Sequence, residues 1–149
     1  MNIIIGSDHR GFKLKQNLIK YLSKKKYSVK DAGTGTDSSV DYPKYALKVG
    51  KSVAGTDCDL GIAVCGSGIG ICIAVNKVNG VRAGTARSVS DAEMMRKHNN
   101  ANVVCMGADE TDLETAKNIV DKFITTDFEG GRHTRRVNLI KRIEKDESR

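Results

Sequence analysis

The fold of this chain is decided by the stretch Leu60-Gly61-Ile62-Ala63-Val64-Cys65-Gly66-Ser67-Gly68-Ile69-Gly70-Ile71. A short apolar run breaks into a loop with glycine at every second position, and Cys65 stands at the break. This pattern predicts a buried strand that turns tightly into a helix. The Cys65 thiol would then lie beside backbone N–H groups, which stabilise anions. A base or nucleophile next to an anion hole is typical of an active site.

Similar alternations of short apolar runs and amphipathic stretches fill the rest of the chain. The predicted strands are Ile3–Gly6, Tyr27–Asp31, Leu60–Val64, Val81–Gly84 and Val103–Met106. The predicted helices are Phe12–Leu22, Tyr45–Val53, Gly68–Val75, Ser90–His98, Leu113–Phe123 and Val137–Ile143. This order predicts an α/β fold, a Rossmann-like three-layer αβα sandwich with a five-stranded parallel sheet. We expect one domain over residues 1–149.

Ligands of such sheets bind beyond the C-terminal strand ends, where the winding reverses. A flavodoxin-like strand order places that point between the first and third strands. Asp8 and His9, which follow the first strand, are therefore expected next to Cys65. The glycine- and serine-rich loop 32–41 is long enough to be functional, and Pro43 suits the first turn of the helix after it.

Composition excludes several classes of protein. The chain is 39% apolar and 29% charged, which is typical of a soluble globular protein. No apolar run approaches the length of about 18 residues that spans a membrane. The first residues, 1–6, lack the basic region of a signal peptide, so we expect a cytoplasmic protein. Cys58, Cys72 and Cys105 form no C-x-x-C pair and are expected to be small buried residues, without disulfides.

The net charge of +7 has two main sources. Residues 10–30 contain eight Lys or Arg and no Asp or Glu, which we interpret as a solvated helix face. A second group, Arg132, His133, Arg135 and Arg136, follows two glycines. Arg132 and Arg136 are four residues apart, so on a helix they share a face and suit a phosphate, although solvated surface charge is the alternative. Aromatic residues are only 5% and no nucleic-acid-reading motif is present, so no nucleic acid is expected.

Two histidines have both structural and functional interpretations. His98 precedes Asn99, Asn100 and Asn102, whose amides could bind the hydroxyl groups of a sugar. His98 could equally close a helix, where the helix dipole stabilises it. His9 could be a packed loop residue. The glycine loop is neither a dinucleotide fingerprint nor a P-loop, and no cluster has metal-ligand spacing, so no cofactor and no metal are expected.

Six segments together resemble the ribose-5-phosphate isomerase B family, which includes allose- and galactose-6-phosphate isomerases. They are 6–11 (GSDHRG), 41–43 (DYP), 65–70 (CGSGIG), 76–77 (NK), 98–102 (HNNAN) and 130–133 (GGRH). The resemblance covers nearly the whole chain. It implies an aldose–ketose isomerase without metal or cofactor, which works as a homodimer with shared active sites, sometimes paired into a tetramer. Its substrate would be a phosphorylated sugar, ribose 5-phosphate, in the non-oxidative pentose phosphate pathway.

The resemblance also implies roles for individual residues. Cys65 would move a proton between sugar carbons 2 and 1, and the amides of Gly66, Ser67, Gly68, Ile69 and Gly70 would hold the enediolate oxygen. Ser67 would assist proton movement between the sugar oxygens, and His98 would open the sugar ring with Asp8 nearby. The phosphate would bind to His9, Arg132 and Arg136, while Tyr42 and Asn99 border the site.

One residue departs from the family pattern. Ribose-5-phosphate isomerases of this family usually carry Arg, which helps hold the phosphate, at the position of Asp109. A carboxylate that pointed inward there would repel a phosphate dianion. It could instead point away, with Arg87 or Arg135 compensating. Two other functions stay open: isomerisation of a six-carbon sugar phosphate such as allose 6-phosphate, and non-catalytic binding of a sugar phosphate.

Overall fold

Five parallel strands form a single sheet in the computed structural model, which describes residues 1–147. The strands are β1 (Asn2–Ser7), β2 (Ser28–Asp31), β3 (Leu60–Cys65), β4 (Ala83–Thr85) and β5 (Val103–Gly107). The helices are α1 (Phe12–Lys24), α2 (Tyr42–Ala54), α3 (Ile69–Val75), α4 (Val89–Asn99), α5 (Leu113–Thr125) and α6 (Arg132–Glu147). The strand order is β2-β1-β3-β5-β4.

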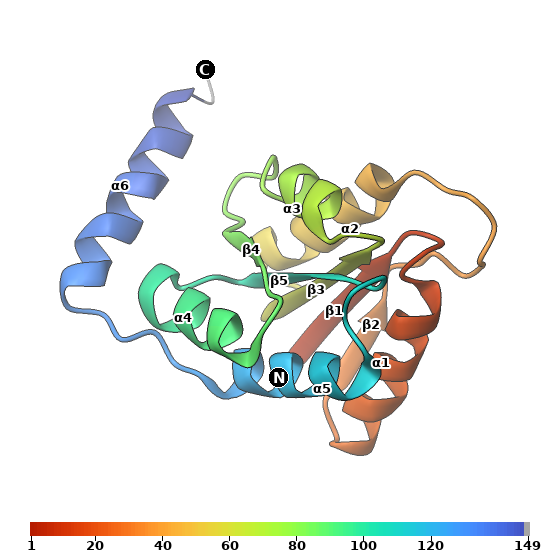
Figure 1. Cartoon of the computed structure of the whole chain (residues 1–149). Coiled ribbons are helices and arrows are strands. Elements are labelled where there is room, and N and C mark those ends of the chain that lie inside the picture. Colours follow the sequence, from red (N-terminus) through yellow and green to blue (C-terminus); the bar gives the residue numbers. More distant parts are fainter. Residues whose placement is uncertain (148–149) are drawn as a thin grey trace.

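The sheet is covered by helices on both faces, which makes the predicted three layers (Figure 1). On one face, Ile3, Ile5 and Ile62 pack with buried residues of α1, α4 and α5. On the other face, Ile4 and Ala63 pack with buried residues of α2 and α3. Alternate residues of β1 and β3 thus point to opposite layers, and both layers are apolar because both faces of a parallel sheet are buried.

The predicted pairing of the first and third strands is confirmed, with Ile5 opposite Ile62 and Ser7 opposite Val64. The flavodoxin-like order is wrong beyond that point, because β5 lies beside β3 and β4 forms the edge. The short β4 is only partly buried, which agrees with its place at the edge of the sheet, where a strand pairs on one side only.

Helix bounds differ from the sequence prediction in two places that matter for the site. Helix α2 begins at Tyr42, three residues earlier than expected, with Pro43 in its first turn as predicted. Helix α6 begins at Arg132 and runs for 16 residues, much longer than the predicted Val137–Ile143. Arg132 and Arg136 therefore do lie on one helix, one turn apart.

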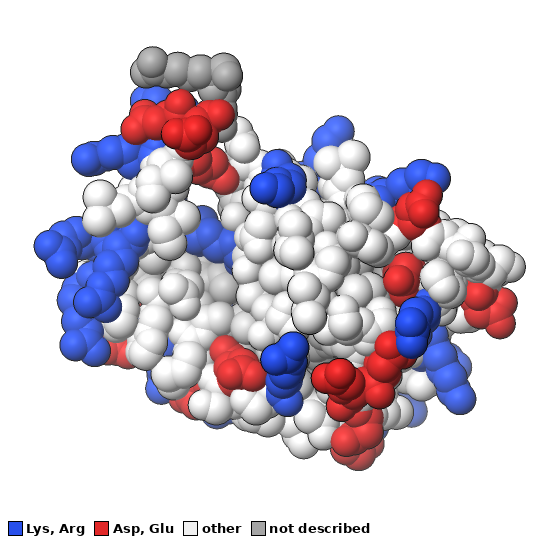
Figure 2. Space-filling model, turned by 45° about the horizontal axis from the view of Figure 1, so that its top comes forward, with Lys and Arg blue, Asp and Glu red and all other residues white. Residues whose placement is uncertain are grey.

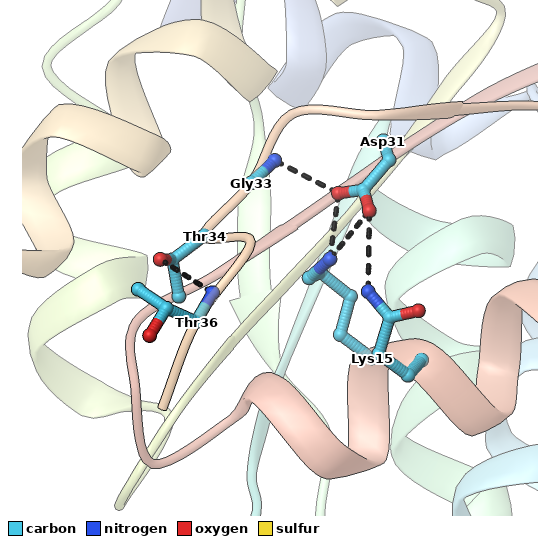
Figure 3. A network of polar contacts seen from close by, with 6 residues as sticks. Lys15, Asp31, Gly33, Thr34 and Thr36 are labelled. Carbon is cyan, nitrogen blue, oxygen red and sulfur yellow. Dashed lines mark hydrogen bonds and ion pairs between the residues drawn. The ribbon is translucent and has the colours of Figure 1, made fainter. Parts of the chain in front are cut away.

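Lys15 is a clear exception to the predicted solvated face of α1, because its side chain is fully buried. Its Nζ atom lies 2.6 and 2.7 Å from the two carboxylate oxygens of Asp31, which also accepts a hydrogen bond from the Gly33 amide (Figure 3). Gly33 and Thr34 then exchange backbone hydrogen bonds with Ser7 at the end of β1. The buried charge is thus paired, as burial requires, and the pair fixes the start of loop 32–41 beside β1.

Helix α6 projects from the body and packs against α4 (Figure 1). A groove of about 670 Å³ separates its C-terminal half from the edge of the sheet, with Met95, Asn99, Ile140 and Ile143 among its lining residues. Figure 2 shows basic side chains gathered along α6 and a broad face without charges beside the groove. Within residues 1–147, no helix has the length and apolarity needed to cross a membrane.

Candidate active site

Cys65 is the last residue of β3 and lies opposite Gly107 at the C-terminal edge of the sheet. Its side chain is buried, and its Sγ atom accepts a hydrogen bond from the Gly68 amide at 3.2 Å. Ser67 is exposed at the crest of the loop, and its Oγ accepts from the Ile69 amide at 3.2 Å. The thiol and the loop amides therefore lie together, as the sequence predicts.

The loop can take this shape only because of its glycines. Gly68 has φ +75°, and a Cβ atom placed on it would lie 2.7 Å from the carbonyl carbon of Met106 and 2.8 Å from the amide nitrogen of Gly107. A Cβ atom on Gly107 would lie 2.7 Å from the backbone of Ser67. The loop thus packs directly on the backbone end of β5, and a side chain at either position would push them apart.

The tip of β1 lies next to Cys65. The Asp8 amide donates to the carbonyl of Val64 at 3.2 Å, and the buried Asp8 carboxylate accepts from the Gly11 amide at 3.0 Å. His9 accepts a hydrogen bond at Nδ1 from the Val40 amide at 3.2 Å, so loop 32–41 holds its ring. With Nδ1 as the acceptor, neutral His9 carries its proton on Nε2, which is a hydrogen-bond donor.

Two side-chain groups flank the glycine loop at its two ends. The Tyr42 ring covers Gly70, because a Cβ atom there would lie 2.8 Å from Tyr42 Cζ. At the other end, Arg10 and Asp109 cover Gly66 and form an ion pair, with 2.6 Å between Arg10 Nη2 and Asp109 Oδ2. The ion-pair partner of Asp109 is thus Arg10.

His98 lies at the opposite edge of the sheet from Cys65. It stands one residue before the end of α4, where the carbonyls of Asn99 and Asn100 accept hydrogen bonds from Arg82, the residue before β4. This is the edge at which β4 and β5 begin, whereas Cys65 lies where β5 ends. Five residues of β5 separate the two edges, roughly 13 Å at the usual rise per residue. Topology therefore does not bring His98 to Cys65 within one chain.

A second cluster forms around His98, on the side that faces α6. The rings of His98 and His133 stack with centroids 4.2 Å apart, and Glu129 Oε2 lies 3.9 Å from His98 Nε2. Arg132 Nε lies 3.4 Å from His133 Nε2 and donates a hydrogen bond to it. Arg132 and Arg136 are therefore at the His98 edge as well, so the predicted site residues fall into two separate groups.

His98, Glu129 and His133 also offer ligand atoms within 4.8 Å of one another, which spacing along the sequence did not reveal. Their surroundings disfavour a cation, however. Loss of hydration lowers the pKa of His133, the neighbouring His98, Arg132 and Arg136 lower it further, and Glu129 partly offsets these effects. The guanidinium charges of Arg132 and Arg136 would repel a metal ion and attract an anion.

The three asparagines after His98 do not all serve a ligand. Asn102 accepts from the Arg82 amide at 2.8 Å and donates to the carbonyl of Gly80 at 2.8 Å, so its amide is used within the fold. Asn100 closes α4 in the left-handed conformation, which Asn tolerates well. Asn99 is exposed and lines the groove beside α6. The predicted sugar-binding role is thus wrong for Asn102.

Cys72 departs from the prediction of a small buried residue. It is only partly buried, and a hydrogen bond from the Cys105 thiol lowers its pKa to about 6. That same hydrogen bond, together with burial, raises the pKa of Cys105. Cys58 and Cys105 are buried as expected, and all four cysteines are free.

Comparison with known proteins identifies the family of this chain. Residues 3–140 match the ribose/galactose isomerase family. The chain belongs to that family. It is a sugar-phosphate isomerase with the α/β fold and all-parallel sheet of its solved relatives.

Solved structures of this isomerase family resemble the chain over nearly its full length. Ribose-5-phosphate isomerase B of Clostridium thermocellum is 46% identical with a TM-score of 0.98, over 99% of this chain and 100% of that one. The Mycoplasma genitalium enzyme, solved with bound ribulose 5-phosphate, is 43% identical with a TM-score of 0.93 over 97% of each chain. A Rickettsia bellii relative, 45% identical over 94% of this chain and 96% of its own, carries only the broader name of sugar phosphate isomerase.

Proposed function

We propose that this isomerase interconverts ribose 5-phosphate and ribulose 5-phosphate. The observation that carries the proposal is the position of Cys65, buried at the tip of β3 with its Sγ bonded to an amide of the glycine loop. The likeness to an enzyme solved with ribulose 5-phosphate supports this choice of substrate. The ribose-5-phosphate isomerases B of Clostridium thermocellum and Mycoplasma genitalium are 46% and 43% identical to the chain.

The reaction needs a base, an anion hole and a proton carrier between oxygens. The Cys65 thiolate takes the proton from carbon 2 of the open-chain aldose, and the electron pair moves to form an enediolate. Amides of the glycine loop stabilise the negative oxygen, because N–H dipoles that the fold holds in place favour developing negative charge. Ser67 moves a proton between the oxygens on carbons 1 and 2. Cys65 then returns its proton to carbon 1, which leaves the ketone at carbon 2.

A second copy of the chain completes this site. His98, Arg132 and Arg136, proposed for ring opening and phosphate binding, lie at the far edge of the sheet from Cys65. A two-fold dimer that pairs the C-terminal edge of one chain with the α4–α6 side of the other would bring both groups together. Exposed Ile73, Ile140 and Ile143, and the groove beside α6, support an interface of this kind.

A coupled assay of the purified protein tests the substrate. Ribose 5-phosphate and allose 6-phosphate are compared at equal concentrations, each with and without EDTA. We expect a higher kcat/KM for ribose 5-phosphate and no loss of activity with the chelator. A preference for allose 6-phosphate would overturn the proposal in favour of a six-carbon substrate. Absence of turnover of both sugars would favour a binding protein without catalysis.

A further inference from the structure

Arg10 and Asp109 form an ion pair directly on the glycine loop, and the reaction as described above uses neither. A Cβ atom on Gly66 would lie 2.9 Å from Arg10 Nε, 3.0 Å from Arg10 Cδ and 2.9 Å from Asp109 Oδ2. Gly66 follows Cys65 in the chain. The pair therefore covers the backbone next to the thiol, and a side chain at position 66 would have to displace it.

Hydrogen bonds anchor Asp109 to the site and close the turn that carries Arg10. The Asp109 amide donates to the carbonyl of Gly66 at 3.1 Å, and the Ala108 amide donates to the carbonyl of Cys65 at 2.8 Å. Arg10 lies in the turn that the Asp8 carboxylate closes by accepting from the Gly11 amide. The pair thus bridges the tips of β1 and β5 across the tip of β3, the central strand of the three.

The pair leaves part of the guanidinium available to an anion. Its one close contact is between Nη2 and Asp109 Oδ2, and a guanidinium has five N–H donors. In the described part of the chain, Asp109 is the ion-pair partner of Arg10, and the Arg10 side chain keeps 59% of its surface exposed. The Asp109 charge is balanced by Arg10, while its position holds the guanidinium over the loop. A lone carboxylate here would repel a phosphate. In the pair, however, the remaining N–H groups of Arg10 can donate hydrogen bonds to a phosphate.

We infer that Arg10 binds the phosphate of the substrate, and that Asp109 is its positioning residue. This inference rests on the proposed function, because it assigns the phosphate subsite of the same active site. It gives the Cys65-bearing chain its own arginine for the phosphate. Arg132 and Arg136 of the partner subunit would then approach the phosphate from the other side.

Steady-state kinetics of single and double variants test the assignment. Arg10→Ala should raise KM for ribose 5-phosphate about tenfold to a hundredfold, the range for losing a charged hydrogen bond, with kcat within about threefold. Arg10→Lys should recover only part of the loss, because an ammonium lacks the planar fork. The exchanged pair, Arg10→Asp with Asp109→Arg, should bring KM closer to the parent value than Arg10→Asp alone. Lys13→Ala, which removes an exposed charge from the same region, should leave KM unchanged.

Binding of inorganic phosphate, measured by calorimetry, separates this inference from the proposed function. If Arg10→Ala weakens phosphate binding in a protein that turns over neither sugar phosphate, the anion site stands and the proposed reaction fails. If the parent enzyme isomerises ribose 5-phosphate but Arg10→Ala and Arg10→Lys change neither KM nor phosphate binding, the inference is wrong. A loss of kcat with unchanged KM in the Arg10→Lys variant, the milder change, would also overturn it, because it would place Arg10 at the reacting carbons.

Discussion

The Sγ atom of Cys65 accepts a hydrogen bond from the Gly68 amide at 3.2 Å, so the proposed base is joined to its own anion hole. The bond holds the sulfur against the loop, beside the backbone N–H groups of the turn. The Gly68 amide belongs to the loop that would receive the enediolate oxygen. This one contact therefore joins the tip of β3 to the glycine loop at the proposed base.

Removing the thiol should abolish catalysis without removing binding. Cys65→Ala should lower kcat by about 10²–10⁴-fold, the usual effect of losing a proton-transfer group. Binding of ribose 5-phosphate, measured by calorimetry, should stay within a few-fold of the parent protein. Cys58→Ala removes another buried thiol, one bonded to Ser52 outside this loop, and serves as the control. Equal kcat in Cys65→Ala and parent would remove Cys65 from the mechanism.

Glycine at position 68 should be required for the fold of the loop. In Gly68→Ala, the new Cβ atom would be attached to a left-handed backbone and would lie 2.7 and 2.8 Å from backbone atoms of β5. The substitution should therefore lower the free energy of unfolding by about 2–5 kcal/mol. Gly131 also has a positive φ, +54°, but a Cβ atom there has nothing within 4 Å. Gly131→Ala should therefore cost only about 1–2 kcal/mol. Urea denaturation compares the two, and equal losses would contradict the close packing of Gly68.

Two inactive variants should restore activity when combined, if the site is shared between subunits. Cys65→Ala and His98→Ala each damage both sites of their own homodimers. A mixed dimer has one site with both changes and one site with neither. Random exchange of equal amounts should thus recover about a quarter of the parent activity. Each variant mixed with more of itself is the control, and recovery no greater than the average of the two variants would argue that Cys65 and His98 serve different sites.

Asp91, in the first turn of α4, should make the stability of the protein depend on pH. The Arg87 and Ser88 amides each donate to Asp91 Oδ2 at 2.9 Å, and these bonds, first that of Arg87, lower the pKa of Asp91. Because the pKa of Asp91 is lower in the folded protein, its carboxylate stabilises the fold at pH values above its ordinary pKa of 3.8. This stabilisation is lost as the pH falls through the lowered pKa. Asp91→Ala should therefore cost about 1 kcal/mol at pH 7 and less near pH 3.

Urea denaturation at both pH values measures this difference. Ser90→Ala, at an exposed position in the same turn, is the matched control and should change little at either pH. If Asp91→Ala lowers the free energy of unfolding equally at pH 7 and pH 3, the ionised Asp91 carboxylate does not stabilise the start of α4.

Much of the site at the C-terminal edge could be predicted from the sequence, because it depends on local pattern. The apolar run before Cys65 can only be buried as a strand, and the glycines after it allow the turn that brings amides to the thiol. Asp8 follows another such strand, and parallel strands end at the same edge of a sheet. Pairing of β1 with β3 then places Asp8 beside Cys65.

Contacts between side chains that are distant in the sequence leave no local pattern from which they could be predicted. Arg10 and Asp109 are separated by most of the chain, and their pairing depends on the tips of β1 and β5 lying on either side of β3. The buried pair of Lys15 and Asp31 was missed because a lysine in a basic segment looks like any solvated charge. No pattern in the local sequence records which partner a long side chain will meet.

The sequence by itself determined the strands, the glycine loop and the thiol at its start, since burial and turn formation act over a few neighbouring residues. Only the tertiary structure decided that β5 lies between β3 and β4, and that His98 and the arginines of α6 lie a full strand length from Cys65. Those outcomes depend on how whole elements pack, because the side on which a strand or helix settles is set by contacts made across the entire chain.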